Sequence, residues 1–460
     1  MKSSDKLRNM PIGKLIVVMS VPAMFSMLIQ SLYNIVDSIY VSQISNTALN
    51  AVNFAFPMQI LIIAFALGIG IGTSSLISRK MGERKPEEAS QIAKTGIFLA
   101  LLAYLLFIII GLFLVEPYLR IMTDNEEIIT MGTQYLQIVL LFSIFVFVEM
   151  TSTKILQGIG NMLIPMIAQI IGAITNIILD PIFIFTFNFG ISGAAIATVI
   201  GQFFSMAFTL CTFIFKKQEI SISLKGFKIH SKNVLGIMNV GLPVTVMNSI
   251  ASLTTATMNS LLMTYSSTKE LGEVVVNVLG VYFKLQSFVF MPIFGLNQGG
   301  MPILAYNYGS NNRGRYYKAL KLILITALIT VSIGLIIFQV FPTQLLSLFN
   351  HNQDMTIIGI DAYRKISISF IPAAFGIIFS MSFQAMGHGT KSLVMSLFRQ
   401  LIILIPFAIM FSILFSVDFI WYSYVIAEIT TALIFVPIAI MTVRKQFALK
   451  QTKHELTLDL

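Results

Sequence analysis

Twelve long apolar stretches constrain this chain more than any other feature of its sequence. A helix needs roughly 20 apolar residues to cross the hydrocarbon core of a bilayer, and each stretch is long enough to do so. With 56% hydrophobic and only 11% charged residues among 460, the composition excludes a water-soluble fold of this size. We therefore predict an all-α integral membrane protein with twelve transmembrane helices, near residues 13–41, 51–78, 92–115, 133–157, 162–186, 190–215, 234–264, 275–305, 319–341, 358–385, 391–415 and 418–443.

The basic residues gather in alternate connections between these stretches, and acidic residues occupy the others. Lys and Arg are concentrated at the N-terminus, at 78–94, 216–232 and 313–321, and after Arg444. With twelve spans, all of these segments fall on one side of the membrane, and the positive-inside rule predicts that both termini are cytoplasmic. The net charge of +10 then needs only membrane lipids of the anionic inner leaflet as its partner, and we expect no nucleic acid partner.

The second half of the chain repeats the first. Gly68, Gly72 and Gly82 each have a glycine 227 residues later, and QGIG at 157–160 is followed at the same distance by QAMG. Each unit has six spans, an even number, so both units start on the same side and are related by an axis along the membrane normal. We predict two pseudo-symmetric six-helix lobes around a central cleft: an N-lobe at 1–215, a cytoplasmic linker at 216–233, a C-lobe at 234–445 and a cytoplasmic tail at 446–460.

An aspartate and a proline stand side by side in the fifth apolar stretch, in NIILDPIFIF at 176–185. Asn176 lies four residues before Asp180 and therefore on the same helix face. Pro181 has no N–H and its ring clashes with the carbonyl of Ile177, so we predict that the helix bends at Pro181. The carboxylate, the amide and the freed carbonyl offer oxygens to Na⁺, and the carboxylate alone can carry H⁺. The alternative is a structural kink at which Asp180 pairs with a neighbour.

The equivalent segment of the second half is IILIPFAIMF at 402–411. It keeps a proline, Pro406, but has no acid. Both lobes can therefore bend at this point, whereas we predict that only the N-lobe binds a cation there.

The first span carries a polar stripe. Gln30, Tyr33, Asn34 and Asp37 recur at helical spacing and share one face. A stripe of this kind faces a cavity or the interior of the bundle and not lipid. The alternative is that Asp37 only ends the first span near the outer surface.

Other polar side chains lie within later spans. Glu149 and Glu428 lie in mid-span. Three bases are available to pair with them, namely Lys154, Lys284 and Arg399. Salt bridges and substrate contacts are therefore both open. Thr198 and Gln202 lie four residues apart among small residues, where helix packing is the default interpretation. The residues that we predict to contact substrate are Tyr33, Asn34, Glu149, Gln202 and Lys284.

The chain lacks the motifs of common membrane enzymes and ATP-driven pumps. It has no Gly-x-x-x-x-Gly-Lys-Ser/Thr phosphate loop, which argues against direct use of ATP. Its four histidines lie outside the apolar spans, which argues against an intramembrane haem or zinc centre. We expect no enzymatic activity and no cofactor besides a coupling ion, and secondary transport fits best.

Six segments resemble the multidrug and toxic compound extrusion (MATE) family, over nearly the whole chain: VPAMFSMLIQSLYNIVDSIYV, GIGTSSLISRKMGE, LQGIGNMLIP, NIILDPIFIF, GISGAAIATVIGQ and FGLNQGGMPILAYNYG. The aspartate-proline pair is similar to the DinF branch and, within it, to MepA-like bacterial exporters. The resemblance implies a monomer in the bacterial plasma membrane that exports small-molecule drugs, amphipathic cationic aromatic ones above all, by antiport against H⁺ or Na⁺. It also implies an N-lobe cation site at Asp37, Asn176, Asp180 and Thr198, in which the first three would hold Na⁺.

Three other interpretations are weaker. A lipid or glycan-lipid flippase of the related superfamily needs a strongly cationic cavity, and only Lys154, Lys284 and Arg399 are available. SRKMGERK at 78–85 superficially resembles a motif of major-facilitator carriers, but Ser78 stands where that motif has Asp. An integral membrane enzyme would need an embedded His/Asp cluster, and none is visible in the spans.

Overall fold

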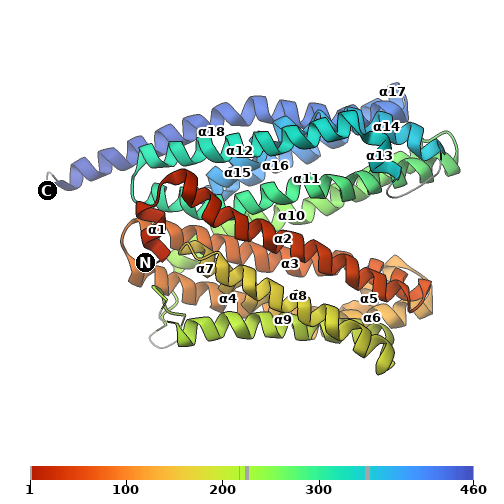
Figure 1. Ribbon diagram of the computed structural model, residues 1–460, viewed down its shortest axis with the longest axis horizontal. Helices are drawn as coiled ribbons and strands as arrows, with labels where there is room; N and C mark the ends of the chain where they lie inside the picture. The colour runs from red at the N-terminus through yellow and green to blue at the C-terminus, as the bar shows by residue number, and fades with distance from the viewer. Residues whose placement is uncertain (1–2, 217, 223–226, 348–352, 459–460) are drawn as a thin grey trace.

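The computed structural model describes residues 3–216, 218–222, 227–347 and 353–458. These residues form helices joined by short connections, as predicted for an all-α protein (Figure 1). The elements are α1 (Ser3–Asn9), α2 (Ile12–Ser42), α3 (Asn46–Gly82), α4 (Pro86–Phe113), α5 (Val115–Met122), α6 (Glu126–Leu141), α7 (Ile144–Gly158), α8 (Leu163–Pro181), η1 (Ile182–Thr186), α9 (Gly190–Phe215), α10 (Ser231–Tyr265), α11 (Lys269–Gly309), α12 (Arg313–Val340), α13 (Pro342–Ser347), α14 (Gln353–Ser367), α15 (Phe370–Met386), α16 (Gly389–Leu397), η2 (Phe398–Leu404), α17 (Ile405–Leu414), η3 (Val417–Phe419) and α18 (Trp421–Leu458).

Ten membrane spans within the described residues are single helices or directly continuous helical segments, each long and apolar enough to cross a bilayer. Two further spans are helix pairs, α6 with α7 and α14 with α15, and each pair is bent by 47° at a short break. Counting each pair as one span gives twelve, at the positions of the twelve apolar stretches. The prediction of twelve transmembrane helices is therefore confirmed.

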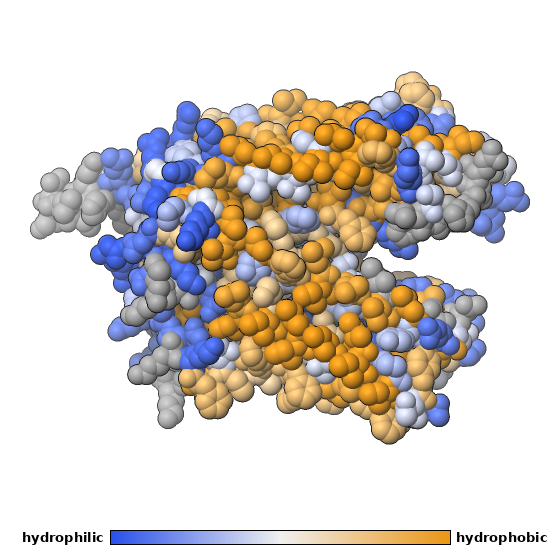
Figure 2. Space-filling view, in the orientation of Figure 1, coloured by the Kyte–Doolittle hydropathy of each residue, from blue (hydrophilic) through white to orange (hydrophobic). Residues whose placement is uncertain are grey.

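The spans form two lobes that lie side by side (Figure 1). Helices α2 to α9 form one lobe, and helices α10 to α18 form the other. The lobes meet where α3 packs against α10 and α2 packs against α11. Both chain termini lie at one end, where hydrophilic residues gather, and the surface between the lobes is hollowed at the opposite end (Figure 2).

The backbone repeats with the same period as the sequence. Arg84 and Asn311 both adopt positive φ angles, of 61° and 54°, and they stand 227 residues apart. Gly160 and Gly387 have the same separation and φ angles of 89° and 87°, in the left-handed region that favours glycine. The two bent spans are the fourth and the tenth, which are equivalent positions in the two halves. The internal repeat predicted from glycine spacing is thus a repeat of local conformation.

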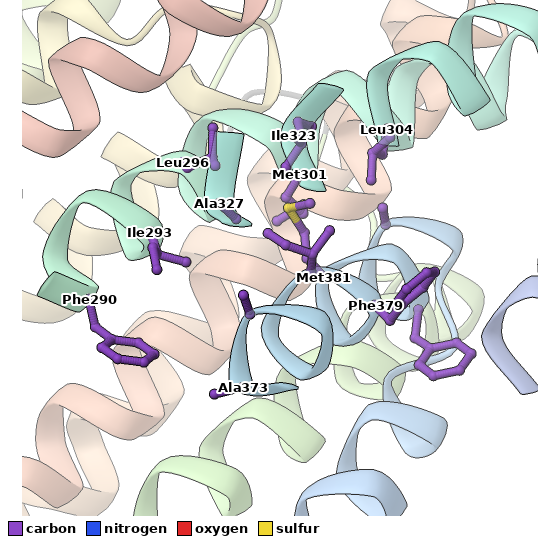
Figure 3. Packing of buried hydrophobic residues seen from close by; sticks show 14 of the residues in the cluster. Phe290, Ile293, Leu296, Met301, Leu304, Ile323, Ala327, Ala373, Phe379 and Met381 are labelled. Carbon is purple, nitrogen blue, oxygen red and sulfur yellow. The ribbon is translucent and has the colours of Figure 1, made fainter. Parts of the chain in front are cut away.

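The buried apolar side chains form two clusters of unequal extent. The larger one combines both lobes, because it includes Met19 and Ile77 of the N-lobe together with Ile237 and Met301 of the C-lobe. Figure 3 shows its C-lobe part, where side chains from α11, α12 and α15 converge around Met381. The second cluster contains N-lobe residues such as Phe107. Close van der Waals packing of this kind holds membrane helices together, since lipid is as apolar as the side chains themselves.

Glycines bring the two lobes into backbone contact at the end that carries the termini. Gly82 of α3 lies against the carbonyl of Tyr306 on α11, and Gly309 of α11 lies against the carbonyl of Arg79 on α3. Each contact is the image of the other, since both pairs of partners are 227 residues apart. A side-chain carbon at either glycine would collide with the facing carbonyl, so this approach requires glycine. The Ser75 hydroxyl adds a bond across the lobes by donating to the Gln384 carbonyl at 2.6 Å.

The fifth span changes helix type at its proline. Helix α8 ends at Pro181 and continues directly into the π-helical turn η1, so the span from Leu163 to Thr186 is not sharply broken. The eleventh span also contains a π-helical turn, η2, followed by α17 with Pro406. A π-helical turn places one extra residue in a helix and is common at functional sites.

Candidate functional site

The fifth and sixth spans hold the centre of the site. Asn176 and Asp180 on α8 are buried, with 3% and 0% of their surfaces exposed. The Asn176 side-chain nitrogen donates to a carboxylate oxygen of Asp180 at 3.2 Å and to the hydroxyl of Thr198 on α9 at 3.3 Å. Close packing of α8 on α9 makes this possible, because Gly172 and Gly201 face one another across the two helices.

Asp37 completes the group from the first span. Its carboxyl group lies beside that of Asp180, within reach of a single shared proton. Two neighbouring carboxylates repel one another in a low dielectric, so a bound cation or a proton stabilises the pair. The structure therefore brings together Asp37, Asn176, Asp180 and Thr198, the four residues that the family resemblance implied.

Acceptor oxygens without donors converge on this region. Among the described residues, one oxygen each of Asp37, Asn176, Asp180 and Gln202 is buried and has no hydrogen-bond donor. Buried acceptors are normally satisfied, since an unsatisfied one costs roughly 1–3 kcal/mol. Hard cations take oxygen ligands, and a carboxylate can also take a proton. The residues present thus fit Na⁺ and H⁺ equally well.

A tyrosine and a glutamine, which the sequence did not single out, support the site. Tyr135 on α6 is buried near both Asp37 and Asp180, and its hydroxyl accepts a hydrogen bond from Gln59 on α3 at 2.7 Å. With its oxygen occupied by that donor, the phenol proton remains available to a carboxylate. Nothing local in the sequence marks Tyr135, because its role depends on how α6 packs against α3.

A small cavity in the N-lobe adjoins these residues. It has a volume of about 90 Å³ and is lined by Tyr33, Glu149 and Gln202, together with Asn176 and Thr198. The Glu149 carboxylate accepts a hydrogen bond from the Ser205 hydroxyl at 3.3 Å. A water molecule takes up about 30 Å³, so this volume suits an ion and a few waters better than a drug.

The other two residues predicted to contact substrate lie elsewhere. Lys284 is exposed on α11 and lines neither this cavity nor the larger one described next. The side chain of Asn34 falls outside the described part of the structure.

A larger cavity of about 470 Å³ lies between the two lobes, and we call it the interlobe cavity. Its wall combines Met27, Ile71 and Lys154 of the N-lobe with C-lobe residues such as Asn248 and Gln298. Pockets of some 300–1,000 Å³ with mostly apolar walls and a few polar groups accept drug-sized molecules. Sequence reasoning did not assign this wall, because no single helix carries a periodic signal for it.

The comparisons with known proteins agree with this architecture. Among curated relatives, the multidrug export protein MepA of Staphylococcus saprophyticus is 25% identical over 417 residues, which cover 90% of both chains. A solved structure described as the outward-facing conformation of a multidrug resistance MATE family transporter of the MOP superfamily superposes with a TM-score of 0.91. It is 28% identical, and the match covers 97% of this chain and 99% of that one.

A second solved structure matches with the same TM-score of 0.91 and the same identity and coverage. It is a MOP superfamily transporter from Pyrococcus furiosus, described as having a binding pocket of reverse polarity that suggests a different function. The sequence model of the MatE family matches residues 22–182 and 243–410, more than half of the chain and both lobes. With its twelve spans in two lobes, this multi-pass membrane protein belongs to the MatE family of transporters.

Proposed function

We propose that the protein is a secondary active multidrug exporter that moves amphipathic aromatic drugs outward in exchange for an inward flow of H⁺ or Na⁺. The observation that carries this proposal is the set of buried acceptor oxygens on Asp37, Asn176, Asp180 and Gln202. A site with acceptors and too few donors favours a cation, and it lies in one lobe beside a drug-sized cavity. The relatives named MepA support export of drugs as the transported cargo.

Coupling follows from linkage between the two sites. Binding of a cation removes the repulsion between Asp37 and Asp180, and the packing of α2 against α8 then changes. If the cation-bound N-lobe favours one arrangement of the lobes and the drug favours the other, each ligand weakens binding of the other. Influx of the cation then drives efflux of the drug. In this scheme the protein works as a monomer and needs no cofactor besides its coupling ion.

The orientation in the membrane follows from the charge distribution. Hydrophilic residues cover the end that carries the termini (Figure 2), and the basic connections predict that this end is cytoplasmic. The hollow between the lobes then faces the outside of a bacterial plasma membrane. The glycine contacts at Gly82 and Gly309 would close the cytoplasmic side in this state.

A lipid or glycan-lipid flippase is the second candidate. It would need several cationic groups in the interlobe cavity to hold a pyrophosphate head group. The charged residues of the described wall are Lys154 and Arg399, and Arg399 is paired with Glu428 at 3.0 Å. One uncompensated charge favours a drug with at most one anionic group over a pyrophosphate.

Vesicles with imposed ion gradients test the proposed function. Purified protein is reconstituted, and efflux of a fluorescent dye is measured first under a Na⁺ gradient and then under a pH gradient. We expect one gradient to drive efflux, and we expect Asp180→Asn to abolish it while the protein stays folded. Normal efflux by Asp180→Asn, or no response to either gradient, would overturn the proposal.

A further inference from the structure

The interlobe cavity has a charge that export of cationic drugs does not explain. Its described wall contains two charged side chains, Lys154 from α7 and Arg399 from η2, and both are positive. They come from opposite lobes, so a molecule in the cavity meets one from each side. A cationic drug would be repelled by both of them.

The ammonium group of Lys154 has only neutral partners. Its nitrogen donates to the side-chain oxygens of Gln157 and Gln298, each at 3.0 Å. Lys154 is buried, with 7% of its surface exposed, and it forms none of the ion pairs found among the described residues. The nearest acid on its own helix, Glu149, lines the separate N-lobe cavity and bonds Ser205. A buried charge without a counter-charge is costly in free energy, unless a ligand supplies one.

The geometry leaves one donor of Lys154 for such a ligand. An ammonium group has three N–H donors, and two of them are taken by Gln157 and Gln298. Both glutamines also line the interlobe cavity, so the third donor is available at its wall. Space for the side chain comes from Gly70 on α3, where a side-chain carbon would lie 2.7 Å from the Lys154 Cγ. The positive group is thus held in place before any ligand binds.

Arg399 contributes much less charge to the cavity. One of its guanidinium nitrogens lies 3.0 Å from a Glu428 oxygen, so its charge is largely compensated within the C-lobe. Lys154 is therefore the main source of positive potential in the cavity.

The internal repeat shows that packing does not require this lysine. The residue 227 positions after Lys154 is Met381, which is buried at the equivalent place in the C-lobe (Figure 3). Methionine has a similar length and no charge, so an unbranched apolar side chain fills this position in the fold. The positive charge at residue 154 is an addition to that packing.

We propose that the interlobe cavity selects amphipathic aromatic molecules that carry a carboxylate, and that Lys154 is the group that recognises it. The carboxylate accepts the free N–H of Lys154, while the methionine-lined and aliphatic walls hold the aromatic part. The inference rests on the proposed function and names its substrate class: anionic or zwitterionic drugs are bound in preference to purely cationic ones.

A matched pair of dyes tests the inference by equilibrium binding, which requires no ion gradient. Rhodamine B carries a free carboxylate, and its ethyl ester has the same ring system without that group. Fluorescence anisotropy with purified wild-type protein should show about tenfold tighter binding of the carboxylate dye. That factor corresponds to about 1.4 kcal/mol.

Three variants identify the group that causes the preference. Lys154→Met, which copies the C-lobe residue, should bind both dyes with equal affinity, whereas Lys154→Arg should keep the preference. Lys321→Met removes a charge at an exposed position of α12 and should behave as the wild type. Thermal unfolding without dye checks that each variant is folded.

Two results would overturn the inference: equal affinity of the wild type for the two dyes, or a preference that survives in Lys154→Met. Failure of the proposed function gives a different result, namely binding of the dyes without efflux under either ion gradient. The same dye pair in the vesicle assay therefore separates an error about the substrate class from an error about transport.

Discussion

The side-chain nitrogen of Asn176 lies 3.2 Å from a carboxylate oxygen of Asp180, and it donates a second bond to Thr198 at 3.3 Å. Because the nitrogen is committed to both, the oxygen of Asn176 faces its surroundings without a donor, as does the second oxygen of Asp180. One amide therefore orients the carboxylate and also presents an acceptor of its own. Asn176 thus affects the binding of Na⁺ and of H⁺ in different ways.

We predict that Asn176→Leu distinguishes the two coupling ions. If the site binds Na⁺, the variant loses an oxygen ligand and should need roughly tenfold more Na⁺ for the same efflux. If the site binds H⁺, Asp180 loses the donor that stabilises its charged form, holds its proton more tightly and releases it only at higher pH. Dye efflux measured against Na⁺ concentration and against pH checks the two outcomes. Unchanged profiles in both series would contradict a role for Asn176.

The glycine contacts at the terminal end give a prediction about the conformational cycle. Gly309→Val places a side chain against the Arg79 carbonyl and should push the lobes apart at that end. A cysteine introduced at the buried Ser75, with the single native cysteine replaced by serine, should then react several-fold faster with a water-soluble maleimide. Gly280→Val on the same helix is the control, since nothing lies within 4 Å of a side-chain carbon there. Equal labelling rates in both variants would argue against a gate at Gly309.

Most of the fold could be predicted because membrane helices leave long, continuous signals. Each span is a run of apolar residues set by bilayer thickness, and all twelve runs correspond to spans of the structure. The repeat was also visible, since the glycines at 82 and 309 are required by close backbone contact and cannot drift in position. The breaks within the fourth and tenth spans were not visible, because Ser143 and Ser369, which flank them, are ordinary residues in a helix.

The candidate site could be predicted only where one helix carried enough of the signal. Asn176 and Asp180 are four residues apart on α8, so their contact follows from helix geometry alone. Tyr135 and Gln59 meet through the packing of two helices, and neither residue type is unusual in its own span. The same holds for the interlobe cavity, where Lys154 reaches Gln298 of the other lobe. Contacts between helices depend on rotation and crossing angle, which sequence periodicity does not specify.

The pair of Arg399 and Glu428 should stabilise the C-lobe. These side chains are 27% and 16% exposed, and a Glu428 oxygen lies 3.0 Å from the guanidinium. Arg399→Ala leaves a mostly buried carboxylate without its partner, which should lower the free energy of unfolding by roughly 3 kcal/mol or somewhat less, given the remaining exposure. Replacing both residues, as Arg399→Met with Glu428→Gln, should restore most of the loss. Thermal unfolding in detergent measures all three variants, and additive losses in the double variant would contradict the pairing.

The short helix α1 is held by the C-lobe at its own C-terminal end. A guanidinium nitrogen of Arg315, on α12, donates to the carbonyls of Leu7 and Met10, each at 3.0 Å. These carbonyls have no partners within α1 because they belong to its last turn, and a positive charge is favourable at that end of a helix. The Ser4 backbone N–H bonds the Glu219 carboxylate of the connection between the lobes at 2.8 Å, so α1 is held at both ends.

We predict that Arg315→Ala releases α1 from the bundle. Two hydrogen bonds from a charged group are lost at a partly exposed position, so amide hydrogen exchange in residues 3–10 should become about tenfold faster. Arg313→Ala is the matched control, since Arg313 lies one turn position away and contacts the ring of Tyr317 at 5.6 Å instead. Mass spectrometry of exchanged peptides measures the rates. Equal protection of this segment in both variants would show that Ser4 and apolar packing hold α1 without Arg315.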